Sequence, residues 1–219
     1  MADHSKPVPR ILWIGNTLLF GFLGLAFLFW FWDLTRNPPP VLRIIGPIAP
    51  FTLTNQSGAA TTLADFTNHV WVADIVFTRC AGPCPRMTAQ MKSVQDLLPK
   101  ESAAKLVTLT TDPEFDAPGV LKKYGEHFGA DFGRWTFLTG TKSEIAALGS
   151  GSLKLSAVPV KPMERNGDAD LFIHSTIFVV VDKHAQLRAF FETGGEGVDW
   201  TNAVRPKLLQ AVHLLENEP

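Results

Sequence analysis

The sequence has little with which to bind nucleic acid or to build a structural zinc centre. Its formal net charge is only −1, and no run of basic residues occurs, which argues against a nucleic-acid partner. It contains only two cysteines, which excludes a zinc site built on two cysteine pairs. The absence of an internal repeat excludes a solenoid. The chain is long enough for one ordinary domain and an appendage.

No charged side chain occurs between Ile11 and Trp32. As a helix rising about 1.5 Å per residue, this span could cross a hydrocarbon core of roughly 30 Å. Tryptophans near both ends, Trp13 and Trp30, suit the two membrane interfaces. A cleavable signal peptide would have a shorter apolar region and a small-residue cleavage site. We therefore predict an uncleaved transmembrane anchor over residues 11–32, after an N-terminal tail of residues 1–10.

A proline-rich segment follows the predicted anchor. The prolines of Asn37–Pro40 indicate a stiff, extended tether over residues 33–45. Basic residues are equal in number on the two sides of the span, so the positive-inside rule does not set its orientation. The remaining residues, 46–219, are predicted to form one domain.

Strands and helices alternate along this domain. Apolar runs predict buried strands at Val70–Phe77 and Lys105–Thr110, and a hairpin joins Ser175–Val181 to Gln186–Phe191. The other expected elements are strands at 51–54 and 135–138 and helical segments at 62–66, 116–128, 143–148 and 200–215. This order predicts an α/β fold of the thioredoxin-like type, with a mixed central sheet flanked by helices.

The two cysteines, Cys80 and Cys84, lie between the predicted strand and a helix expected to begin at Pro85. A helix N-terminus favours the thiolate form, which attacks disulfides and binds metals. Positions four apart on a helical turn have Cβ atoms about 5–6 Å apart. Both sulfurs could therefore reach one metal ion or form a disulfide. Soft sulfur ligands select Cu(I), and a nearby imidazole would also admit Cu(II). A pair of inert core cysteines is the competing interpretation.

His174 is the best candidate for that imidazole. It directly precedes the predicted strand at 175–181, in a loop that lies beside the active-site turn of a thioredoxin-like sheet. A structural, hydrogen-bonded histidine is the alternative. The other histidines have no comparable position: His4, His69, His127, His184 and His213.

Two aspartates follow the second buried strand. Asp112 precedes Pro113 and most simply makes a turn, whereas Asp116 most simply caps the next helix. A role in orienting His174 or the cysteine loop is the alternative for both. Met87 and Met91 have a helical spacing that favours core packing over metal ligation.

Three segments together resemble the signatures of the Sco/SenC family. They are Phe77-Thr-Arg-Cys-Ala-Gly-Pro-Cys-Pro85, Asp112-Pro-Glu-Phe-Asp-Ala-Pro118 and His174-Ser175, in the family's order and approximate spacing. The chain departs from the common pattern at Ala81, where the family often has proline, and at Ile173, where many members have aspartate. The resemblance covers roughly residues 46–216.

The resemblance implies a copper metallochaperone that binds one copper through Cys80, Cys84 and His174. It also implies delivery to, or preparation of, the copper A site of cytochrome c oxidase. The expected partners are the copper-site subunit of the oxidase, other copper carriers and thiol reductants. The expected location is an inner membrane, with the domain in the periplasm or in the mitochondrial intermembrane space.

Two enzymatic interpretations compete with the copper chaperone. A thiol–disulfide oxidoreductase would use the same two sulfurs, although such enzymes usually have two residues between their cysteines and this chain has three. A peroxiredoxin-like peroxidase is the weaker one, because it rests only on Thr78 lying two residues before Cys80.

Overall fold

The structure is a computed structural model that describes residues 10–36, 42–159 and 172–218. Side chains are not described for residues 10–18, 33–36, 157–159 and 172–174. The chain divides into two units, Met1–Val41 and Leu42–Pro219. Helix α1, Arg10–Arg36, belongs to the first, and its described side chains are all exposed. Among the described residues, no helix combines the length and the apolarity needed to cross a membrane, so the anchor stays a prediction.

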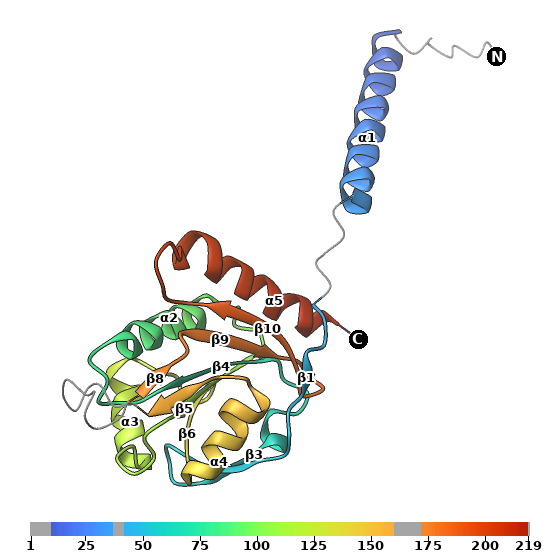
Figure 1. The fold of residues 1–219 in the computed structure, drawn as a ribbon. Helices are drawn as coiled ribbons and strands as arrows, with labels where there is room; N and C mark the ends of the chain where they lie inside the picture. Colours follow the sequence, from blue (N-terminus) through green and yellow to red (C-terminus); the bar gives the residue numbers. More distant parts are fainter. Residues whose placement is uncertain (1–9, 37–41, 160–171, 219) are drawn as a thin grey trace. The chain divides into compact units, whose positions relative to one another are not determined.

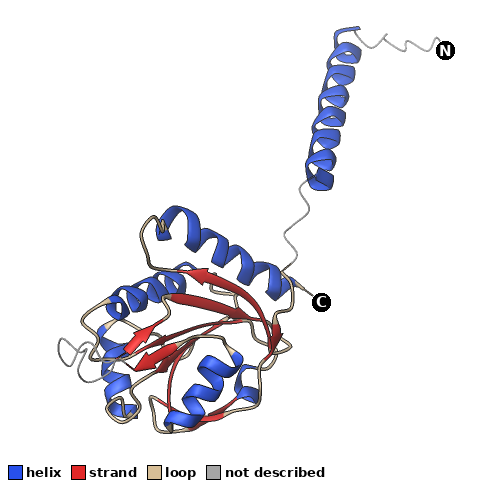
Figure 2. Cartoon of the chain, in the orientation of Figure 1, coloured by secondary structure: helices blue, strands red, loops and turns tan. Residues whose placement is uncertain are grey.

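The second unit is built on an eight-stranded mixed sheet (Figures 1 and 2). Its strands are β1 Gly46–Pro47, β2 Thr52–Asn55, β3 Ala60–Thr62, β4 Trp71–Val76, β5 Lys105–Thr110, β6 Trp135–Thr139, β9 Ile177–Val181 and β10 Gln186–Glu192. Their order across the sheet is β1-β10-β9-β4-β5-β6-β2-β3. Strands β4, β5 and β6 are parallel, and β9 pairs antiparallel with β4. The predicted mixed sheet is thereby confirmed.

Helices cover both faces of this sheet (Figure 1). They are α2 Pro83–Leu97, α3 Pro118–His127, α4 Lys142–Ala146 and α5 Arg205–Asn217, with a short 3-10 helix at Leu63–Phe66. Side chains of α2, α3 and α5 share one hydrophobic cluster, and Ile145 of α4 belongs to the cluster on the other face. All six residues of β4 are buried, because the sheet is covered on both faces, and five of the six are accordingly apolar, Asp74 being the exception.

Several boundaries differ from the sequence prediction. Helix α2 begins at Pro83, so Cys84 lies inside its first turn and not before it. The predicted helix at 143–148 is α4 followed by a π-helix, Ala147–Ser152, and a second π-helix, Trp200–Val204, precedes α5. A separate strand pair was not predicted: β7, Ala157–Pro159, with β8, Phe172–His174.

The beginning and the end of the second unit are held together by one buried cation, Arg188, which is 7% exposed. Its guanidinium pairs with Asp182 at 2.6 Å and with Glu218 at 2.7 Å. The same group donates from Nε to the carbonyl of Leu42 at 3.1 Å. Arg188 therefore joins the start of the domain to its C-terminal residues.

Replacing this cation tests its contribution to stability. We expect Arg188→Met to lower the free energy of unfolding by about 3 kcal/mol, because the Asp182 carboxylate would stay buried without its partner. Urea denaturation of the full chain in mild detergent measures this change. Glu218→Gln is the control, since the Glu218 side chain is 42% exposed and should contribute less than about 1 kcal/mol. Equal effects of the two substitutions would contradict the expectation.

Candidate metal centre

The sheet register brings three loops to one edge. Val76, the last residue of β4, pairs with Thr110, the last residue of the parallel strand β5. The antiparallel strand β9 begins at that same edge, because Ala73 pairs with Val179 and Trp71 with Val181. The cysteine loop after β4, the aspartate segment after β5 and the residues before β9 are therefore neighbours.

The two cysteines lie together at this edge and are both reduced. Cys80 is 8% exposed, whereas Cys84 is completely buried. The Cys80 N–H closes a turn by donating to the carbonyl of Phe77 at 3.2 Å. Both sulfur-bearing side chains pack with Val76 and Phe77 in a small apolar cluster. The predicted juxtaposition of Cys80 and Cys84 on a strand–helix turn is thus what the fold produces.

The surroundings of Cys84 favour its neutral thiol. A hydrogen bond with the Cys80 thiol raises the pKa of Cys84, and burial raises it further. A hydrogen bond with the Phe77 backbone opposes this rise, and the charge of Asp74 adds to it. The two thiols are therefore hydrogen-bonded to each other, and of the two residues only Cys80 has any exposed surface.

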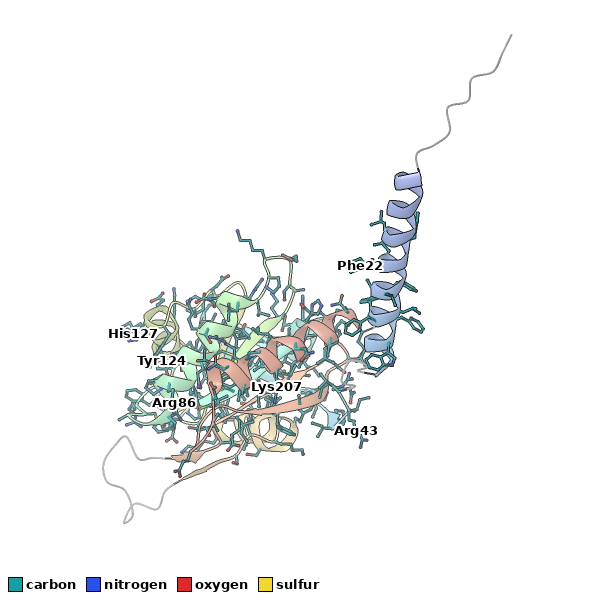
Figure 3. The ribbon with its side chains drawn as sticks, turned by 90° about the horizontal axis from the view of Figure 1, so that it is seen from above. Phe22, Arg43, Arg86, Tyr124, His127 and Lys207 are labelled. Carbon is teal, nitrogen blue, oxygen red and sulfur yellow. The ribbon has the colours of Figure 1, made fainter. Side chains whose placement is uncertain are left out.

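Tyr124 of α3 covers the cysteine cluster. Its hydroxyl lies 2.7 Å from the hydroxyl of Thr88, which in turn donates to the carbonyl of Cys84 at 3.0 Å. Burial raises the pKa of Tyr124, the hydrogen bond with Thr88 opposes this rise, and the nearby carboxylate of Asp74 adds to it. Figure 3 labels Tyr124 and, on α2, Arg86. The first turn of α2 is thus linked to α3 next to the sulfurs.

Asp116 holds the chain just before Cys80. Its carboxylate is completely buried and accepts a hydrogen bond from the N–H of Thr78 at 3.1 Å and another from the Thr78 hydroxyl. It also accepts one from Thr110 at 2.5 Å. Burial raises the pKa of Asp116, and these hydrogen bonds counter the rise. The predicted helix cap is wrong: Ala117 occupies the N-cap position of α3, because the Asp116 side chain points to the cysteine loop.

Asp112 makes the predicted turn and a second contact with the cysteine loop. Its carbonyl accepts from the N–H of Phe115 and of Asp116, which closes the turn. Its carboxylate pairs with Arg79 at 2.6 Å, and the Arg79 guanidinium lies 4.2 Å from the centre of the Phe115 ring. The two residues before Cys80 are thus both held by aspartates.

His174 is the last residue of β8, and its backbone pairs with that of Ala157. The chain continues through Ser175, whose N–H donates to the carbonyl of Ser156 at 2.9 Å, into β9. The imidazole lies outside the described atoms, so its place beside the sulfurs stays a prediction. Among the side chains that are described, no three of His, Cys, Asp or Glu group to hold a metal ion.

The loop after β10 lies next to both the chain that follows His174 and the helix that carries Cys84. A Cβ on Gly194 would meet the guanidinium of Arg86, two residues after Cys84, and would lie 3.1 Å from Cβ of Thr176, two residues after His174. The N–H of Thr193 donates to the carbonyl of Thr176 at 2.7 Å. The loop after β10 therefore bridges the two segments.

Sequence reasoning missed three residues of this site: Asp74, Thr78 as a partner of Asp116, and Tyr124. Asp74 is the only charged residue in the strand run 70–77, and a lone carboxylate in an otherwise apolar strand could have singled it out. No local pattern marks the other two, because their contacts join residues 36 or 38 positions apart.

Comparison with known proteins identifies the family. Residues 46–208 match the SCO1/SenC family. The chain belongs to this family. The resemblance carried by the cysteine, aspartate and histidine motifs is therefore confirmed, and with it the thioredoxin-like arrangement of sheet and helices.

Individual family members agree with this assignment. A SCO1 protein homolog of Bacillus subtilis is 38% identical over 136 residues, which cover 61% of this chain and 67% of the relative. BsSco, described as a member of the Sco family of cytochrome c oxidase assembly proteins with a disulfide switch, has a TM-score of 0.65 at 27% identity, covering 80% of this chain and 97% of that one.

A more distant member, Bradyrhizobium japonicum ScoI, has been solved with copper bound. Its TM-score is 0.63 at 20% identity, covering 78% of this chain and 99% of that one. At this identity the likeness establishes the fold.

The unequal burial of the two thiols predicts unequal reactivity. We expect iodoacetamide to alkylate Cys80 at least about tenfold faster than Cys84, because Cys84 is buried and its pKa is raised. Mass spectrometry of peptides from the reduced full chain, sampled over time, measures both rates. Cys80→Ser is the control, in which Cys84 should stay slow. Equal rates in the wild-type chain would contradict the expectation.

Proposed function

We propose that this protein is a copper metallochaperone that binds one copper through Cys80, Cys84 and His174. Two neighbouring sulfurs at one turn are the observation that carries the proposal. Thiolates are soft ligands and suit Cu(I), and an imidazole lets such a site also take Cu(II). Metal binding through both sulfurs would release the protons of both thiols.

His174 is the proposed third ligand. The register of β4 with β9 supports this role, because it places the start of β9, shortly after His174 and Ser175, at the edge of the sheet where the cysteine loop lies. The contacts of Gly194 with Arg86 and Thr176 support it too. An imidazole on the β8 side of the site would complete a three-ligand centre of two sulfurs and one nitrogen.

The proposed recipient is the copper A site of cytochrome c oxidase. BsSco, a relative, is described as belonging to a family of assembly proteins for this oxidase, and ScoI of Bradyrhizobium japonicum binds copper. The partners we propose are the copper-site subunit of the oxidase, other copper carriers and thiol reductants. The exposed residues Ala81 and Gly82, beside Cys80, leave room for a partner to approach the sulfur.

A thiol–disulfide oxidoreductase is the second candidate function. It is favoured by the unequal burial of the two cysteines, since the less buried Cys80 can attack a client disulfide while Cys84 resolves the mixed disulfide. This function gives His174 no obligatory task. Reduction of a client disulfide that survives His174→Ala would support the oxidoreductase over the chaperone.

Copper stoichiometry tests the proposal. We expect the reduced full chain, loaded with copper anaerobically in mild detergent, to bind one copper per chain with sulfur ligands. Elemental analysis and X-ray absorption at the copper edge measure the stoichiometry and the sulfur count. Cys80→Ala, Cys84→Ala and His174→Ala should each lose tight binding, because each removes a ligand.

His184→Ala is the matched histidine control. His184 is exposed in the turn between β9 and β10, at the opposite end of β9 from His174, and its removal should leave copper binding unchanged. Unchanged tight binding in Cys84→Ala would reject the copper assignment. Unchanged binding in His174→Ala would remove the histidine from the ligand set.

We also propose that residues 11–32 anchor the domain in a membrane. The uncharged run and the exposed apolar side chains of α1 support this anchor; the large ones include Phe20, Phe22, Phe27, Phe29, Trp30 and Trp32. The domain would face the periplasm in a bacterium or the intermembrane space in a mitochondrion. Tethering would raise its effective concentration beside a membrane-embedded client.

Membrane extraction tests the anchor. We expect the full chain to stay in the membrane pellet after alkaline carbonate treatment, and a variant without residues 1–41 to be released, because the uncharged span is missing. N-terminal sequencing of the mature protein is the control against a cleaved signal peptide. Release of the full chain, or a mature N-terminus beyond Trp32, would contradict the anchor.

A further inference from the structure

The segment that follows β5 forms hydrogen bonds with the two residues that precede Cys80. Asp116 accepts hydrogen bonds from both the N–H and the hydroxyl of Thr78. Asp112 accepts from Nε of Arg79 at 3.2 Å and from Nη2 at 2.6 Å. Two consecutive residues of the cysteine loop are thus each held by two hydrogen bonds to one carboxylate.

The two aspartates are themselves held by Thr110, the last residue of β5. The Thr110 hydroxyl donates to Asp116 at 2.5 Å and accepts from the N–H of Asp112 at 2.9 Å. Thr110 pairs with Val76, the last residue of β4. The loop that carries Cys80 is therefore anchored at its start by β4 and along its length by the aspartates.

We propose that Asp116, with Asp112 as its auxiliary, is a positioning residue that fixes Cys80 beside Cys84 for metal binding. The inference rests on the proposed copper function and adds the residues that set the geometry of the site. Cys84 is held by its helix and by burial, whereas Cys80 precedes α2. The Cys80 N–H closes the turn by donating to the carbonyl of Phe77, and the two aspartates hold the residues within that turn, Thr78 and Arg79. Fixing them keeps the Cys80 sulfur within reach of the metal that Cys84 binds.

The chain offers a matched control for a purely structural role. Like Asp116, Asp182 is buried and holds a turn: it accepts two backbone N–H groups, from His184 and Gln186 at 2.9 Å each, and it binds the Arg188 side chain. It follows Val181, which pairs with Trp71 at the other end of β4, roughly 17 Å from the cysteine edge. Loss of Asp182 should reduce stability without moving Cys80.

The test compares three variants of the full chain in mild detergent. Asp116→Asn keeps the shape of the side chain but replaces one carboxylate oxygen, which accepts hydrogen bonds, with an NH₂ group that can only donate. Thr78→Val is milder, because it removes one hydroxyl and retains the backbone contact. Asp182→Asn is the control. Cu(I) affinity is measured by competition with a chromophoric chelator, Cys80 access by alkylation rate, and stability by urea denaturation.

We expect Asp116→Asn to weaken copper binding about 10- to 100-fold, the range typical when a group that orients a metal ligand is lost. Thr78→Val should weaken it by a smaller factor, and both should speed alkylation of Cys80. Asp182→Asn should lose stability while its affinity and alkylation rate match the wild type. Wild-type affinity in both site variants, or equal weakening in the control, would overturn the inference.

Failure of the proposed copper function is distinguishable from failure of this inference. If the wild-type chain binds no copper, the function is rejected, and the alkylation rates still judge the positioning role. Faster alkylation of Cys80 in Asp116→Asn and Thr78→Val but not in Asp182→Asn would retain it. Unchanged rates in all three would reject it.

Discussion

The parallel pairing of β4 with β5 is the constraint on which the site depends. It sets Val76 opposite Thr110, so the loop with Cys80 and the segment with Asp116 leave the sheet at the same edge. The antiparallel strand β9, on the other side of β4, brings the chain after His174 to that edge. A shift by one residue would turn every side chain of β4 to the opposite face, and the buried run would no longer fit its two hydrophobic clusters.

The two sulfurs differ because they belong to different structures. Cys84 is part of α2 and is buried with Tyr124, whereas Cys80 belongs to the irregular turn before the helix and reaches solvent. Burying a carboxylate such as Asp116 costs several kcal/mol, and hydrogen bonds to a charged group return about 1.5–3 kcal/mol each. With three such bonds, the gain and the cost are comparable. The arrangement therefore contributes geometry more than stability, which suits a residue that holds a ligand in place.

Sequence reasoning succeeded where one local rule decides. The run 105–110 became a strand with the predicted bounds, because its aliphatic and β-branched residues suit a strand that is buried from Leu106 to Thr110. It was less accurate at α2, because Pro83 and Pro85 both suit the first turn of a helix. The helix begins at the earlier proline, Pro83, with Gly82 as its N-cap. It failed at Asp116, since a capping preference is local and the competing contact with Thr78 comes from 38 positions away. The place of the His174 imidazole stays a prediction, because that side chain lies outside the described atoms.

Two buried carboxylates hold turns at opposite ends of the same sheet. Arg188, held by Asp182, joins Leu42 at the start of the domain to Glu218 near its end, so this end carries the contacts that close the fold. Asp116 and Asp112 hold the loop at the cysteine end, where the Cys80 N–H also closes a turn onto Phe77. Between them, β4 is buried along its whole length and close packing leaves it little freedom to move. The sheet therefore separates the contacts that close the fold, at one end, from the cysteine site, where the proposed exchange of metal or electrons would take place, at the other.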